Sequence, residues 1–334
     1  MQWKNIAKDT KFRLVEVFLL QIILFALLFD PKIFMGGDAH AYFNLAESIR
    51  DGSYREIWTP ENKLNSWIPP LFPLILVPFG HNYLAVKGLM ILLTLLSTYL
   101  IWQLFRNWWV LLLFVSNLAV LEFSHYELTE IPYLVCVLGF FYCWRQAKTV
   151  PFFILMVCGF YLRSEGILLY LTFLIGGLIY YRKSILLKVS IGYLLSIIPW
   201  LIYSYSAGDN ERLIALLQKD IYRPELGNIG VGDFILRVIH NFKYYFIGDG
   251  GNILINFHWI FTLPLMVIAF VGLLKNHEII LIFAALHFGL LLCWTESATH
   301  WRYALCLSPF LMLGLVNGLQ PVLLWIKRAL RGAD

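Results

Sequence analysis

The feature that most constrains this chain is a long succession of apolar segments separated by short polar loops. Of its 334 residues, 60% are hydrophobic and only 14% are charged, whereas a soluble domain is nearer a quarter charged. The mean hydropathy is +0.70. Because backbone groups in lipid must be satisfied within the segment, such apolar stretches are expected to be helices. The predicted fold class is therefore an all-α polytopic membrane protein.

The apolar segments predict about ten membrane-spanning helices. They are Val15–Phe29, Val86–Phe105, Trp108–Phe123, Ile131–Trp144, Pro151–Leu162, Ile167–Tyr181, Val189–Tyr205, Phe257–Leu274, Ile279–Trp294 and Tyr303–Ile326. The basic N-terminus precedes an apolar run without an A-x-A cleavage site, so the first span is expected to be retained. Lysines and arginines gather at both termini and in alternate loops, which predicts that both termini are cytoplasmic. No internal repeat or soluble module is found, and residues 1–334 are predicted to form one membrane-embedded domain.

Two longer polar stretches, 31–70 and 207–254, are expected on the outer side as the first and fourth outer loops. In the first, apolar residues recur at helical spacing over Ala39–Arg50, which predicts an amphipathic helix on the membrane surface. Leu74–Phe79 is too short to span and predicts a re-entrant or surface helix. In the other loop, we expect surface helices at Leu213–Leu217 and Phe234–Phe246.

Asp38 stands at the start of the first outer loop, directly after two glycines. One interpretation is an N-cap for the following helix, a position that suits aspartate. The other is a reactive carboxylate just outside the bilayer. The two interpretations are compatible.

Arg163 and Glu165 lie between two apolar segments that are each short for a spanning helix. Two such helices meeting here would place the charges below the outer surface, where ionised groups are costly and are usually paired or functional. An ion pair of Arg163 with Glu165 or with Glu130 could simply hold helices together. A substrate site is the alternative.

Cysteine and histidine residues give little sign of a metal or redox site. All five cysteines lie in apolar segments without a C-x-x-C pair, so we interpret them as small buried hydrophobic residues. His40, His125 and His300 are expected on the outer side, but their separation has no metal-ligand spacing. His300 has aromatic neighbours and is interpreted as part of an interfacial belt, with a sugar platform as the alternative. No cofactor is predicted. The net charge of +5 suits anionic lipid headgroups rather than nucleic acid.

Five short motifs, in order along residues 36–310, together resemble the GT-C glycosyltransferases. The quoted motifs are Gly37-Asp38 with the aromatic Tyr42-Phe43, Pro69-Pro70-Leu71-Phe72-Pro73-Leu74, Thr129-Glu130-Ile131-Pro132, Leu162-Arg163-Ser164-Glu165-Gly166, and Arg302-Tyr303-Ala304-Leu305 with Pro309. They are similar to the family's loop aspartate, its Pro-Pro-Gly-Tyr-Pro-Leu stretch, its Ser-Glu-Pro span head, its Thr-Arg-Pro-Glu-Gly turn and its Arg-Tyr-Leu-Leu-Pro end. The nearest branch would be that of protein O-mannosyltransferases and lipid A aminoarabinose transferases.

The resemblance implies an inverting transferase that moves a sugar from a polyprenyl phosphate to an acceptor hydroxyl of a glycan, lipid or protein. It implies Asp38 as the general base, Glu130 as a positioning or acceptor-contact residue, and Arg163 and Arg302 as partners of the lipid phosphate. Tyr42, His40, Glu165 and His300 complete the candidate substrate contacts. Loop 31–70 would be catalytic, and loop 207–254 would cover the acceptor or donor. The expected location is the outer face of a cytoplasmic membrane.

The chain also departs from the family pattern. Ala39 and His40 follow the loop aspartate where many members have a second acid, which puts a two-carboxylate or metal-dependent mechanism in doubt. Ser164 replaces the proline of the arginine turn, and Leu71 and Phe72 replace the Gly-Tyr of the proline stretch.

Two other function classes remain open at the sequence level. A transporter or lipid flippase could use broken helices with a charge pair at Arg163 and Glu165, although no repeated halves are found. A structural subunit of a membrane complex has no positive sign. The discriminating observation is whether Asp38, Glu130, Arg163 and Arg302 come together.

Overall fold

The computed structural model describes most of the chain. The described residues are 2–32, 37–180, 183–207, 216–221, 223–248, 259–274, 278–295 and 301–331. Within them the all-α prediction is confirmed, because they form helices and no strand. Two isolated bridges, Arg55 with Leu64 and Gln218 with Asn228, close short turns in the loops.

The helices follow one another along the chain with mostly short connections. They are α1 Gln2–Leu28, α2 Gly37–Arg50, α3 Leu71–Leu76, η1 Val77–Phe79, α4 Tyr83–Phe105, α5 Trp108–Val115, α6 Leu118–Phe123, α7 Glu130–Arg145, α8 Thr149–Leu162, η2 Ser164–Gly166, α9 Ile167–Tyr180, α10 Lys183–Ser206, η3 Pro224–Leu226, α12 Val231–Phe246, α13 Trp259–Leu274, α14 Glu278–Cys293, η6 Trp301–Leu307 and α15 Ser308–Arg331. Here η marks a 3-10 helix.

Three of the helices in the described ranges are long and apolar enough to cross a membrane, namely Tyr83–Phe105, Lys183–Ser206 and Trp301–Pro321. Further apolar helices are shorter, such as Thr149–Leu162 and Glu278–Cys293. This supports association with a membrane. The number of ten spans stays a prediction.

Two predicted spans differ from the structure. The segment Trp108–Phe123 is not one helix, because Ser116 and Asn117 interrupt it. The side chain of Asn117 accepts a hydrogen bond from the Val120 N–H at 3.1 Å and so caps a new helix, α6. The last predicted span begins with the 3-10 helix η6, and the α-helix starts only at Ser308.

Two of the helices predicted in the long loops are present, and their position on a membrane surface stays a prediction. Helix α2 covers the predicted Ala39–Arg50, and α12 covers Phe234–Phe246. Leu74–Phe79 lies in α3 and η1 as a short helical turn. The predicted helix Leu213–Leu217 lies mostly outside the described residues.

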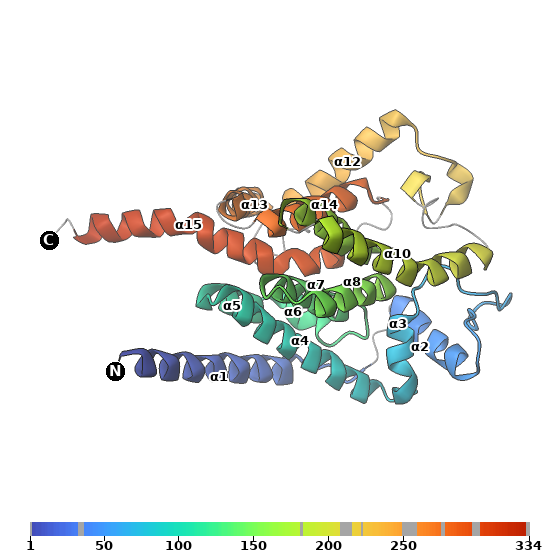
Figure 1. Ribbon diagram of the computed structural model, residues 1–334, viewed down its shortest axis with the longest axis horizontal. Coiled ribbons are helices and arrows are strands. Elements are labelled where there is room, and N and C mark those ends of the chain that lie inside the picture. Colours follow the sequence, from blue (N-terminus) through green and yellow to red (C-terminus); the bar gives the residue numbers. More distant parts are fainter. Residues whose placement is uncertain are drawn as a thin grey trace.

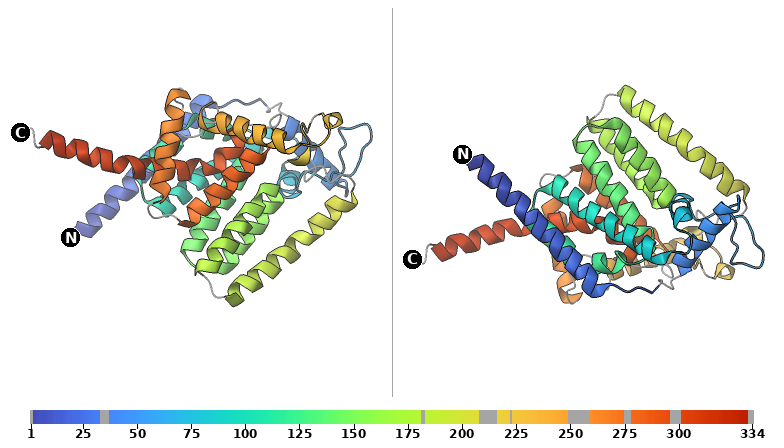
Figure 2. Two further views of the ribbon diagram at one scale, coloured as in Figure 1. Left: turned by 90° about the horizontal axis from the view of Figure 1, so that it is seen from above. Right: turned by 90° about the horizontal axis from the view of Figure 1, so that it is seen from below.

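The two termini project from one end of the molecule, while α2, α3 and the loop after α2 lie at the opposite end (Figure 1). Helix α10 runs along the flank of α8 and α9 (Figure 2), and the Tyr170 and Tyr193 rings stack at 4.3 Å between α9 and α10. The topology, with both termini cytoplasmic and the first long loop on the outer side, stays a prediction.

Helix α7 is almost entirely buried and forms the centre of the bundle. Phe141 of α7 packs edge-on against Phe310 of α15, with ring centroids 5.0 Å apart. Glycines bring α13 and α15 into backbone contact, because a Cβ on Gly314 would lie 2.1 Å from the carbonyl oxygen of Ala269. The first residue of this central helix is Glu130, so the packing fixes the position of one predicted site residue.

Candidate active site

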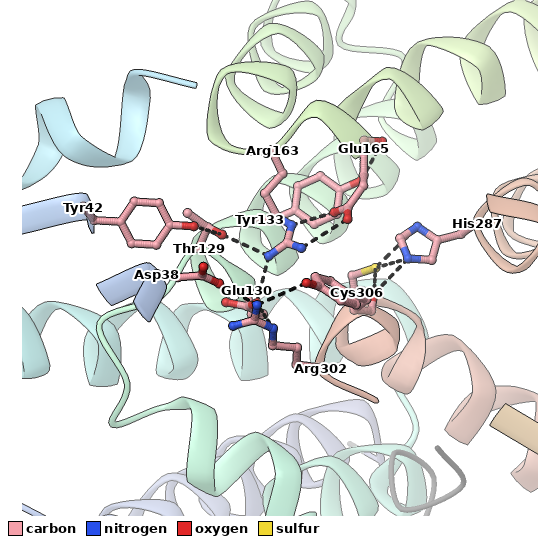
Figure 3. A network of polar contacts seen from close by, with 11 residues as sticks. Asp38, Tyr42, Thr129, Glu130, Tyr133, Arg163, Glu165, His287, Arg302 and Cys306 are labelled. Atoms are coloured by element: carbon pink, nitrogen blue, oxygen red, sulfur yellow. Dashed lines mark hydrogen bonds and ion pairs between the residues drawn. The ribbon is translucent and has the colours of Figure 1, made fainter. Parts of the chain in front are cut away.

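Asp38 lies in the first turn of α2, with its carboxylate directed at Arg302 (Figure 3). The Asp38 Oδ2 atom is 2.5 Å from the Arg302 Nη2 atom. The N-cap interpretation is therefore wrong, because the helix begins one residue earlier and the carboxylate forms an ion pair instead. Helix α2 is fixed by its apolar face, where Ala39 and Leu45 are fully buried.

Glu130 joins the two arginines. Its Oε1 atom is 2.9 Å from Arg163 Nη1 and 3.6 Å from Arg302 Nε. As the first residue of α7 it also faces the positive end of the helix dipole, which favours a carboxylate. Its Oε2 atom is buried and has no hydrogen-bond partner among the described residues. Glu130 thus keeps one acceptor oxygen unused.

Arg163 occupies the extended residue between α8 and η2. It holds Glu165 through two hydrogen bonds, Nε to Oε2 at 2.6 Å and Nη2 to Oε1 at 3.2 Å, and it donates to Thr129 Oγ1 at 3.0 Å. Both of the predicted ion pairs, with Glu165 and with Glu130, are therefore present. Such a two-point contact fixes the plane of the guanidinium.

Tyr303 packs between the two arginines. The Arg163 and Arg302 guanidinium carbons lie 5.3 Å and 5.0 Å from its ring centroid, which is within the range of cation–π attraction. Arg302 also donates to the Tyr303 hydroxyl at 3.1 Å. Both arginines therefore contact the same aromatic ring in addition to their carboxylate partners.

Tyr42 completes the cluster on the side of α2. Its hydroxyl lies 3.3 Å from Thr129 Oγ1, and its ring packs edge-on against Phe72 at 5.0 Å. Burial raises the pKa of the Tyr42 hydroxyl well above its usual range, and the neighbouring Asp38 and Glu130 raise it further. Tyr42 is therefore neutral at physiological pH and able to donate a hydrogen bond.

The charges in the cluster nearly balance. Three carboxylates (Asp38, Glu130 and Glu165) face two guanidinium groups (Arg163 and Arg302) and leave one net negative charge. A cavity of about 10 Å³ lies against Glu130, Arg163 and Arg302. Its size admits at most about one water molecule. A sugar or a phosphate is larger than this cavity and could occupy it only if some of these ion pairs separated.

The predicted histidines are not among the residues that form the cluster in the described part of the chain. His40 is exposed on α2, and His300 lies outside the described residues. His125 is buried, and its ring nitrogens face the carbonyls of Leu121 at 2.8 Å and Phe25 at 3.3 Å. Within the described ranges, no group of three His, Cys, Asp or Glu side chains has the arrangement of a metal site.

The sequence reasoning missed several residues of the site. Thr129, Tyr133 and Tyr303 lie within or beside the quoted motifs. Their closeness in sequence to predicted site residues was therefore the signal that could have identified them. Tyr133 donates to the Glu165 carbonyl at 3.2 Å. Buried His287, on α14, faces Cys306 Sγ with its Nε2 atom at 3.5 Å, and neither residue carried a local signal.

Another buried ion pair joins α4 to the loop that precedes α7. Lys87 Nζ is 3.1 Å from Glu127 Oε1, and both side chains are at most 1% exposed. Lys87 also donates to the carbonyl of His125 at 2.7 Å. A lone lysine near the start of an apolar helix was the available signal, because such residues are costly unless paired.

The cluster thus joins groups from α2, α7, the α8–η2 junction and η6, and Glu130 links the Arg302–Asp38 pair to the Arg163–Glu165 pair. Chemically, it offers carboxylates able to accept a proton and guanidinium groups suited to a phosphate. Comparison of the chain with known protein families, curated proteins and solved structures finds no match.

Proposed function

We propose that this protein is a membrane glycosyltransferase that moves a sugar from a polyprenyl-phosphate donor to an acceptor hydroxyl, with inversion, at the outer face of the cytoplasmic membrane. One observation carries the proposal. The acids and the cations that such a transfer requires, Asp38, Glu130, Arg163 and Arg302, converge on one partly buried cluster from four separate segments. This convergence is what the resemblance to GT-C enzymes requires.

The first step is binding of the donor. Its phosphodiester carries a negative charge and would compete with Asp38 for Arg302, which is the guanidinium nearest α2. Guanidinium groups bind phosphate oxygens through paired hydrogen bonds. Arg163 is held more firmly by Glu165 and Glu130 and would serve as the fixed second cation. Binding of the phosphate therefore separates Arg302 from Asp38 and releases the carboxylate.

The second step is the transfer. The freed Asp38 carboxylate accepts the proton of the acceptor hydroxyl while the acceptor oxygen forms a bond to the anomeric carbon of the sugar. The bond from that carbon to the phosphate oxygen breaks, and its electron pair stays on the phosphate. The phosphate gains one negative charge, and the arginines stabilise it in the transition state. The Glu130 Oε2 atom can accept a hydrogen bond from a hydroxyl of the sugar or of the acceptor substrate.

The proposal is tested first by lipid binding. Native mass spectrometry of the purified protein against a panel of polyprenyl phosphates should show a retained lipid, and Arg302→Ala and Arg163→Ala should weaken it by about tenfold or more. Arg50→Ala is the matched control, because Arg50 also pairs with a glutamate but is half exposed on the far end of α2. A folded protein that retains no polyprenyl phosphate would overturn the proposal.

A transporter or lipid flippase is the second candidate, and the break between α8 and α9 favours it. Arg163 and Glu165 lie at this break as a charge pair, as in transporters that bind substrate at discontinuous helices. Turnover separates the two functions. Release of polyprenyl phosphate from a lipid-linked sugar, with appearance of the glycosylated acceptor, supports the transferase. Passage of an intact lipid-linked sugar across a vesicle membrane supports the transporter.

A further inference from the structure

Helix α12 is amphipathic in the opposite sense to most surface helices. Its outward face is apolar and exposed, with Val231 at 81%, Ile235 at 55% and Leu236 at 64%. Its inward face is polar, since Arg237 and Asn241 are at most 2% exposed. An outward apolar face suits lipid. The buried polar side chains must instead form hydrogen bonds inside the protein, because burying a polar group without a partner is costly.

The inward face holds the end of α14. The Asn241 Nδ2 atom lies 3.2, 3.0 and 2.7 Å from the carbonyl oxygens of Leu291, Leu292 and Trp294. The last carbonyls of a helix have no partner within the helix, and here a side chain from α12 supplies the donors. Asparagine is a poor helix former, so this capping explains its place in the middle of α12.

Helix α12 forms a second contact with the chain at Trp301, the residue before Arg302. The backbone N–H of Trp301 donates to the Tyr244 hydroxyl at 3.0 Å. Asn241 and Tyr244 are almost one helical turn apart on α12 and therefore share a face. Helix α12 thus binds the chain on both sides of residues 296–300, and the second contact adjoins the arginine that pairs with Asp38.

We propose that α12 positions Arg302 for the donor phosphate, with Asn241 and Tyr244 as positioning residues. The inference rests on the proposed function, because it assigns Arg302 to the phosphate. Removing the Tyr244 hydroxyl leaves the Trp301 N–H without this acceptor and loosens the start of η6. Arg302 then meets the phosphate with a wider spread of orientations, and binding weakens.

A double-mutant cycle tests the coupling. Tyr244→Phe and Asn241→Ala should each weaken binding of a polyprenyl phosphate by about three- to tenfold. In the Arg302→Ala background the same substitutions should have no further effect, because they act through Arg302. Leu236→Ala, on the exposed apolar side of α12, is the control and should leave binding unchanged.

Equal weakening by Tyr244→Phe in both backgrounds, or none in either, would overturn the proposal. Hydrogen–deuterium exchange without lipid gives an independent readout. Peptides covering residues 294–307 should exchange faster in both variants, while peptides of α4 and α7 stay unchanged and report correct folding. If the wild type binds no polyprenyl phosphate, the proposed function fails together with the role of Arg302. If binding is retained but exchange at 294–307 is unchanged, only the positioning role fails.

Discussion

Asp38 and Arg302 are 264 residues apart and form the shortest contact of the cluster, at 2.5 Å. In the proposed mechanism this ion pair is a resting state in which each partner blocks the other. Asp38→Asn should therefore affect turnover and lipid binding differently. Turnover should fall by roughly 10²- to 10⁴-fold, the usual contribution of a general base. Binding of polyprenyl phosphate should stay equal or become tighter, because Arg302 loses its competitor.

Glu47→Gln is the control for this prediction, since Glu47 lies on the same helix and pairs with the exposed Arg50. Radioactive sugar transfer and lipid titration measure the two quantities. The competition model would be contradicted if Asp38→Asn weakened lipid binding as strongly as Arg302→Ala.

At Gly166, the turn that carries Arg163 and Glu165 packs against the backbone of α8. A Cβ at this position would lie 2.2 Å from the Gly159 carbonyl carbon, whereas one on Gly88 would meet nothing within 4 Å. Gly166→Ala should therefore destabilise the protein by about 1–3 kcal/mol or more, because backbone atoms must move apart. Gly88→Ala, inside α4, should be neutral or stabilising. Thermal unfolding in detergent compares the two variants, and equal Tm values would contradict the argument.

The loop between α6 and α7 is pinned to α4 by Lys87 and Glu127, and it leads into Thr129 and Glu130. Lys87→Met should cost about 3–5 kcal/mol, because a buried carboxylate loses its cation. The double variant Lys87→Met with Glu127→Leu should recover part of that loss, since no buried charge remains. Lys243→Met, at an exposed position on α12, is the control. A double variant less stable than Lys87→Met alone would show that the pair is not the main anchor.

Most helices of this protein could be predicted from the sequence, because apolar runs bounded by charges, glycine and proline mark them. The ends of α7, at Glu130 and Arg145, are of this kind. The break at Ser116 and Asn117 was missed, because two polar residues in an apolar run do not outweigh the hydropathy of the segment. The 3-10 start at Trp301 depends on tertiary contacts such as the Tyr244 hydroxyl, which no local pattern contains.

The candidate site was predictable as a set of residues but not as a geometry. Charges such as Arg163 in apolar surroundings point to pairing or function wherever they occur. Their partners depend on how helices from distant parts of the chain pack. The pairing of Asp38 with Arg302, and the small size of the cavity beside Glu130, follow only from the assembled bundle.

At the scale of the whole molecule, the proposal requires the cluster to face the side of the membrane opposite the termini. Both termini lie at one end, and the loop after α2 lies at the other (Figure 1). Glu61, exposed in that loop, is a suitable reporter. A membrane-impermeant maleimide should label Glu61→Cys in intact cells, whereas Ala147→Cys, exposed after α7, should be labelled only after the membrane is opened.

The unsubstituted chain is the control for this labelling, because Cys158 and Cys293 are partly exposed. A tag at either terminus should become accessible together with Ala147→Cys, since basic flanking residues favour the cytoplasmic side. Labelling of Glu61→Cys only in opened cells would place Asp38 and Arg302 at the cytoplasmic face. Transfer from a donor presented on the outer leaflet would then be impossible, and the proposed reaction would have to take place at the cytoplasmic face.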